Sequence, residues 1–92
     1  MNIGETIKTI RKEKKISRGH LAEMTGLSIT ALYNIETNRS MPTRDTIRRI
    51  CKALSIPTYY LMVRCVTEDD IPEEKREAFR ALYPLLIKIA ED

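Results

Sequence analysis

Four side chains between residues 29 and 34 could form hydrogen bonds and apolar contacts with the edges of flat heterocycles. They are Ile29, Thr30, Tyr33 and Asn34, which recur at helical spacing within the segment SITALYNIET. The amide of Asn34 offers a donor and an acceptor side by side, which adenine matches, and Thr30 can form a hydrogen bond or touch a thymine methyl group. Ile29 offers apolar contact alone, whereas Tyr33 could reach a base or a phosphate. This set is suited to contacting base edges.

A second group of residues has the types that bind phosphate. Free amides and the positive end of the helix dipole favour an anion at a helix start, and Ser17, Ser28 and Thr43 are suitable N-caps. The phosphate candidates are Ser17, Arg18, Ser28, Asn38, Arg39, Ser40, Thr43 and Arg44. Such contacts fix orientation and salt dependence without carrying sequence information. A plain solvated role is an equal alternative for Arg39 and Arg44, and Arg48, Arg49 and Lys52 are assigned to the ordinary surface.

Gly26 separates the two short helices that would position these residues. A glycine just past a helix end can adopt the left-handed conformation that stops the helix and turns the chain. A short helix, a tight turn with glycine and a second helix form a helix-turn-helix unit. The apolar, small or glycine positions of that unit are occupied by Leu21, Ala22, Gly26, Leu27, Leu32 and Ile35. Ile29 and Tyr33 could instead be core residues, but Leu32 and Ile35 already supply the inner face.

Three more helices are expected in residues 1–66. The first begins at Asn2, with Glu5 as a capping-box partner, and the fourth follows Thr43, with Ile47, Ile50, Cys51 and Leu54 repeating at helical spacing. Pro57 opens a brief fifth helix. No segment alternates polar and apolar residues long enough to predict a strand, so the expected class is all-α.

The sequence of residues 67–92 predicts an acidic linker followed by one more helix. Asp70, Pro72 and Glu73 mark its expected start, and Pro84 inside it predicts a kink or break. Its apolar seam consists of Phe79, Leu82, Leu86 and Ile89. The seam could fold back on the domain or pair with a second chain. Dimerisation is favoured because one helix-turn-helix reads few base pairs, whereas a dimer places two recognition helices about 34 Å apart.

Composition narrows the possible functions. Of the 92 residues, 1–66 hold twelve Lys and Arg against five Asp and Glu, a net charge of +7, whereas 67–92 hold four against eight, a net charge of −4. A basic body with an acidic extension suits a polyanion-binding domain, although an uneven solvated surface would look the same.

Two cysteines and one histidine are too few for a metal-ligand set, and no cofactor is expected. The sequence contains no nucleophile–base set of the kind that would indicate an enzyme.

No apolar run is long enough to span a membrane, and the N-terminus lacks an export signal. The cysteine usage fits a reduced, cytoplasmic protein.

Residues 3 to about 63 resemble the lambda-repressor-like (xenobiotic-response-element) helix-turn-helix domains of bacterial and phage repressors. The matching stretches are IGETIKTIRKEKKIS, LAEMTGLSITALYNIETNRSMPT and TIRRICKALSIPTYYLM. The resemblance implies five helices, sequence-specific binding to double-stranded DNA as a dimer, and pairing of Arg11 with Glu36. The chain departs from the pattern at Arg18, where glutamine is usual, and at Asn38 and Ser55, where glycine is usual.

Two functions follow from these patterns. The first is a DNA-binding transcription regulator, specifically a repressor that acts as a dimer on a palindromic operator. The alternative is an antitoxin-like or accessory interaction module, in which the C-terminal helix binds a regulatory protein partner.

Overall fold

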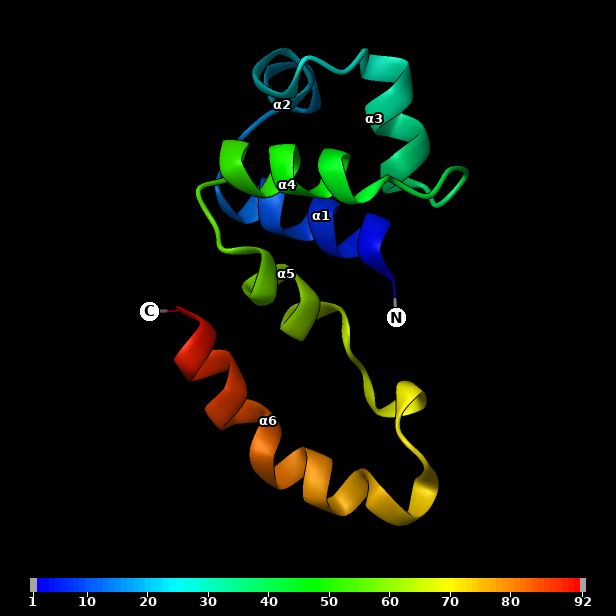
Figure 1. Cartoon of the computed structure of the whole chain (residues 1–92), viewed down its shortest axis with the longest axis vertical. Coiled ribbons are helices and arrows are strands. Elements are labelled where there is room, and N and C mark those ends of the chain that lie inside the picture. Colours follow the sequence, from blue (N-terminus) through cyan, green and yellow to red (C-terminus); the bar gives the residue numbers. More distant parts are fainter. Residues whose placement is uncertain (1, 92) are drawn as a thin grey trace.

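The computed structural model describes residues 2–91, and within that range every regular element is helical, as the sequence predicts. Figure 1 shows the arrangement. The helices are α1 (Ile3–Glu13), α2 (Arg18–Thr25), α3 (Ile29–Glu36), α4 (Arg44–Ala53), α5 (Thr58–Cys65) and α6 (Arg76–Glu91), with short 3₁₀ turns η1 (Glu68–Asp70) and η2 (Glu73–Lys75) before α6.

The first four helices begin at the caps that the sequence predicts. In each case a side-chain oxygen accepts a hydrogen bond from the backbone N–H three residues later, which satisfies one of the free amides of the first turn. The capping residues are Asn2, Ser17, Ser28 and Thr43. Gly26 ends α2 with a φ of 75°, the left-handed conformation expected of it.

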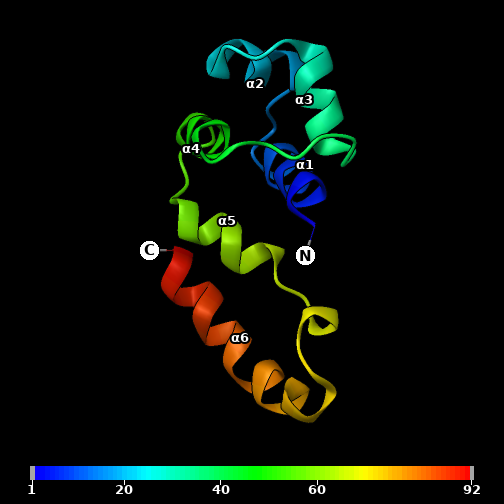
Figure 2. The same ribbon diagram turned by 45° about the vertical axis from the view of Figure 1, so that its right-hand side comes forward.

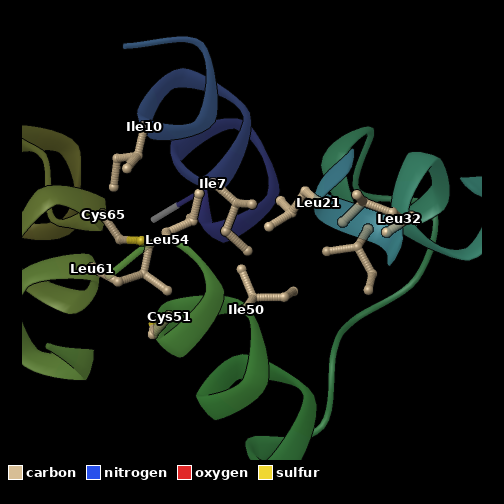
Figure 3. Close-up of a cluster of buried hydrophobic side chains, with 11 residues drawn as sticks. Ile7, Ile10, Leu21, Leu32, Ile50, Cys51, Leu54, Leu61 and Cys65 are labelled. Atoms are coloured by element: carbon tan, nitrogen blue, oxygen red, sulfur yellow. The ribbon is translucent and has the colours of Figure 1, made fainter. Parts of the chain in front are cut away.

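The core lies where α1 meets the other helices of the body. Helix α1 packs against α3 and α5, and α2 packs against α3 and α4. Figure 3 shows Ile7 and Ile10 of α1 among buried residues from the other four helices. Cys51 and Cys65 are buried there as free thiols, and burial raises the pKa of both. They therefore pack as small apolar groups.

A surface ion pair links α5 to the end of α1. Arg64 donates from Nη1 to Oε1 of Glu13 at 2.6 Å and from Nη2 to Oε2 at 2.9 Å. The hydrogen bonds from Arg64 lower the pKa of Glu13. The contribution of this pair to stability is therefore present at neutral pH and is lost in acid, as the pH falls through that lowered pKa.

The start of the last helix differs from the sequence prediction. Asp70 accepts a hydrogen bond from the backbone N–H of Thr67 at 2.9 Å, so it closes η1 and does not cap α6. Pro72 precedes η2, and α6 begins only at Arg76. The ring of Pro72 fixes its φ at −54° but its ψ of 142° is extended, so the chain cannot yet be helical at this point.

Of the kink or break expected at Pro84, the break is absent, since α6 runs without interruption from Arg76 to Glu91. The helix curves along its length in Figure 1. Pro84 and Arg80 are both exposed, so the carbonyl group that Pro84 leaves without a donor can be hydrated.

Helix α6 does fold back on the body, but not through the predicted seam. It packs on α5, where Tyr83 donates a hydrogen bond to the carbonyl of Val63 at 3.1 Å. Ala90 is 3% exposed, and it lines a hollow beside Ile10 and Tyr60. Phe79 is half-buried and packs against Tyr83, with ring centroids 5.0 Å apart and the rings tilted by 38°. Ile87 of α6 is half-buried as well, whereas Leu82, Leu85, Leu86 and Ile89 remain exposed.

Gly4 marks a close approach between α1 and α3. A Cβ atom at this position would collide with the backbone oxygen of Ile35 and lie 2.6 Å from Oδ1 of Asn38. Because a backbone oxygen cannot swing aside, the two helices can approach this closely only if residue 4 has no side chain.

We therefore expect Gly4→Ala to lower the free energy of unfolding by about 1–3 kcal/mol, the range for overpacking, in urea denaturation followed by circular dichroism. Gly19→Ala is the matched control. Its added Cβ would meet only Cδ1 of Ile29, at 3.8 Å, so the helix propensity of alanine should stabilise α2 by up to about 1 kcal/mol. Equal effects of the two changes would contradict the close approach.

Candidate nucleic-acid interface

Helix α3 presents three of the four candidate base-contacting residues on an open surface. Ile29 is 59% exposed and Tyr33 is 39% exposed, and Thr30 is exposed as well. Asn34 is half-buried at the edge of this face. Leu32 and Ile35 fill the core on the opposite side of the helix. The phase of α3 is therefore the one expected, and Ile29 and Tyr33 are not core residues.

The position of α3 is fixed by a buried carboxylate. Glu36, at the end of the helix, has a fully buried side chain that accepts hydrogen bonds from Nε of Arg11 at 2.7 Å and from Nη2 of Arg11 at 3.1 Å. Nη1 of Arg11 donates to the carbonyl of Ile16 at 2.8 Å. The pair thus joins α1, the α1–α2 turn and α3, because two parallel hydrogen bonds fix distance and orientation together.

Arg18 also binds Glu36, through Nε at 3.0 Å from Oε1. Its guanidinium group lies 5.0 Å from the centre of the Tyr33 ring, and that of Arg39 lies 5.7 Å from the same ring. Both distances are within the range of a cation–π contact. Two cations therefore border the exposed ring in the middle of the candidate surface.

The phosphate candidates differ in the hydrogen bonds that their side chains already make. The hydroxyl oxygens of Ser17 and Ser28 accept backbone hydrogen bonds as caps, which leaves each O–H able to donate to an anion. The hydroxyl of Thr43 donates to Thr46 at 3.0 Å. The side-chain amide of Asn38 donates to Asn2 at 2.8 Å. The remaining basic and hydroxyl candidates outside α2 are exposed around the α3–α4 connection, namely Arg39, Ser40 and Arg44.

Two departures from the family pattern preserve backbone geometry. Asn38 and Ser55 have φ values of 62° and 57°, so both adopt the left-handed conformation that glycine would adopt. At Asn38 the side chain also ties the end of α3 to the start of α1. Asparagine tolerates a positive φ better than most residues.

Sequence reasoning missed the role of Arg49. Its Nη1 donates to the carbonyl of Thr25 at 3.1 Å, beside the turn at Gly26. It satisfies one of the last carbonyls of α2, which lack partners within the helix. No local signal distinguishes Arg49 from its exposed neighbours Arg48 and Lys52, because the acceptor lies on a different helix.

Within residues 2–91 the structure holds no group of three or more side chains arranged to bind a metal ion. In the same range, no helix has the length and apolar character needed to cross a membrane.

Comparison with known proteins assigns the family. A model of the helix-turn-helix domain matches residues 4–64, most of the chain and all of α2 and α3. The chain belongs to the helix-turn-helix family. Members of this family are DNA-binding transcription regulators and not enzymes, which agrees with the exposed face of α3 and with the resemblance seen in the sequence.

Several curated relatives of this helix-turn-helix protein are repressors by name. The immunity repressor protein of Bacillus phage phi105 is 41% identical over 56 residues, which cover 61% of this chain and 39% of the relative. The HTH-type transcriptional repressor RghR of Bacillus subtilis is 33% identical over 91 residues, 98% of this chain and 64% of the relative. The chain therefore spans less than two thirds of either repressor. The ImmF control region 10 kDa protein of phage phi105 is 35% identical over 72 residues, 78% of this chain and 77% of the relative.

The buried ion pair of Arg11 and Glu36 predicts that a single conservative substitution will lower the free energy of unfolding strongly. Glu36→Gln removes the negative charge and leaves Arg11 buried without a counter-ion, so the free energy of unfolding should fall by about 3–5 kcal/mol, measured by urea denaturation. Glu13→Gln is the matched control, because Glu13 is 52% exposed and breaking a surface pair should cost at most about 1 kcal/mol. Similar losses in both variants would show that Glu36 is not the key constraint.

Proposed function

We propose that this protein is a transcriptional repressor that binds double-stranded DNA sequence-specifically, as a dimer on a palindromic operator. The observation that carries the proposal is the open face of α3, which exposes apolar and hydrogen-bonding side chains and on which two arginines border the ring of Tyr33. In a helix-turn-helix unit, the second helix enters the major groove and its exposed residues meet base edges. The named repressors among its relatives support the same function.

Each of the four candidate residues of α3 would make a different contact with DNA. The side-chain amide of Asn34 would form paired hydrogen bonds with adenine, and Thr30 would bond to a base or touch a thymine methyl group. Ile29 would add apolar contact with thymine methyl groups, and Tyr33 would reach a base or a phosphate. A good paired contact to a base is worth about 1–3 kcal/mol of discrimination.

Phosphates would be bound around this face by basic and hydroxyl groups. The contributors are Ser17, Arg18 and Ser28 at the starts of α2 and α3, together with Asn38, Arg39, Ser40, Thr43 and Arg44 along the connection to α4. Contacts of this kind set the orientation of α3 and make affinity fall steeply as salt rises. Asn38 and Thr43 already donate hydrogen bonds within the protein. Arg39 and Arg44 would therefore bind phosphate more strongly than these two residues.

The dimer would form through the exposed face of α6. Leu82, Leu85, Leu86 and Ile89 follow i, i+3, i+4, i+7 spacing and are 46–69% exposed, which is unusual for a monomer. A second copy is the occupant we favour, because an apolar helix stripe complements itself across a two-fold axis, and because one helix-turn-helix reads few base pairs. Phe79 would border this face from its place against Tyr83.

The two surfaces lie at opposite ends of the molecule. Figures 1 and 2 show α3 and α6 at the two ends of the long axis in both views, and that axis measures 42 Å. Pairing through α6 would therefore leave both copies of α3 uncovered. The acidic residues beside α6 would also be repelled by DNA, which favours a protein partner on that end.

Selection of bound duplexes from a random pool tests the function directly. We expect an inverted repeat whose half-sites are separated by one helical turn, about 34 Å, or a multiple of it. Asn34→Ala should weaken one base preference by about 1–3 kcal/mol while the slope of log affinity against log salt stays the same, because no charge is lost. Arg44→Gln is the contrasting variant, expected to weaken all duplexes alike and to reduce that slope by about 1. Failure to enrich any sequence would refute the function.

The dimer is tested by mass measurement. Combining Leu82→Glu with Ile89→Glu places charges on the exposed stripe, so a species of about twice the 10.7 kDa chain mass should become monomeric in sedimentation equilibrium. Met41→Glu is the control, since Met41 is 77% exposed but lies in the α3–α4 connection. A wild-type protein that is monomeric by itself and forms a stoichiometric complex with a different protein through α6 would instead support the accessory-module alternative.

A further inference from the structure

We infer that Arg18 is a positioning residue for base recognition, which holds the ring of Tyr33 in its DNA-reading orientation by linking it to the buried carboxylate of Glu36. This inference rests on the proposed DNA-binding function and assigns one residue a role in specificity. The role is distinct from charge neutralisation, which any cation at the start of α2 could supply.

The first observation is the way the two arginines near Tyr33 differ. Arg18 lies 5.0 Å from the ring centre and Arg39 lies 5.7 Å from it. Nε of Arg18 is bound to Oε1 of Glu36, and the side chain of Arg18 is only 29% exposed. Arg39 is exposed, and none of the hydrogen bonds or ion pairs found within residues 2–91 involves its guanidinium group. Of the two arginines, Arg18 therefore contacts the ring from a fixed anchor and Arg39 does not.

The second observation is that the anchor does not depend on Arg18. The side chain of Glu36 is fully buried, and Arg11 by itself donates one hydrogen bond to each of its two oxygens, at 2.7 and 3.1 Å. If Arg18 is replaced, Glu36 keeps a buried counter-ion and two hydrogen bonds. The fold should therefore survive the substitution, and an effect on recognition can be separated from unfolding.

The physical consequence is pre-organisation of Tyr33. A 39% exposed tyrosine without a stacking partner would occupy several rotamers, and fixing one of them on binding costs conformational entropy. A guanidinium plane that is itself held by a hydrogen bond restricts the ring before DNA arrives. Lysine is a poorer substitute, because its ammonium group is a point charge without the planar guanidinium group that contacts the ring and Glu36 together.

The test is Arg18→Lys, which keeps the charge and removes the planar group. The bases that Tyr33 reads are first identified as those whose preference is lost in Tyr33→Ala during duplex selection. At those bases, we expect Arg18→Lys to reduce discrimination by about two- to fivefold, the range of an exposed cation–π contact. Discrimination elsewhere in the site and the salt slope should not change. Arg39→Lys, the matched control without an anchor, should change discrimination less than twofold.

A double-mutant cycle isolates the link between the two residues. In the Tyr33→Ala background, Arg18→Lys should have no further effect on base preference. The inference is overturned if Arg18→Lys leaves preference intact, if its effect persists without Tyr33, or if Arg39→Lys has an equal effect. Uniform weakening of all duplexes would likewise assign Arg18 to phosphate binding alone.

A measurement on the free protein keeps the two proposals separate. Couplings that report χ1 of Tyr33 by NMR should indicate one dominant rotamer in the wild type and in Arg39→Lys, and averaging in Arg18→Lys. Averaging already present in the wild type would overturn the positioning role even if sequence-specific binding is found. A fixed rotamer that depends on Arg18, in a protein that prefers no sequence, would refute the proposed function instead.

Discussion

The fold of this protein is organised around the carboxylate of Glu36. Burying a charged group is unfavourable unless it is paired and fully hydrogen-bonded, and here both oxygens are bound by Arg11 while Arg18 adds a third donor. Arg11 also binds the carbonyl of Ile16. One carboxylate therefore fixes α1, the turn into α2 and the end of α3 relative to one another.

The consequence for recognition is that a short helix is held rigidly. An eight-residue helix such as α3 would be marginal in isolation. It is stabilised at its start by the Ser28 cap, and at its end by Glu36 and by the close approach of Gly4 to Ile35. Its outer face can then carry exposed apolar and aromatic side chains without any of them being needed for folding.

The charge distribution along the chain matches the shape of the molecule. The basic body contains α3 with its bordering arginines, whereas the acidic segment forms the η turns and α6 at the far end (Figure 2). Separation of this kind steers a polyanion towards one end and leaves the other end for apolar association. The stripe of α6 that packs on α5 and the stripe that remains exposed are two different faces of one helix.

Local patterns were sufficient for most of the helices, because a cap, a glycine or a 3.6-residue period acts within one or two turns. The sequence alone thus determined the all-α class, the four caps, the turn at Gly26 and the outward face of α3. It did not determine where α6 begins, that α6 continues through Pro84, or which of its faces meets α5. Nor did it reveal that Arg49 binds Thr25, or that Arg18 reaches both Glu36 and Tyr33. The face of α6 that meets α5 and the contacts of Arg49 and Arg18 depend on atoms brought together from different helices, so only the tertiary structure decided them.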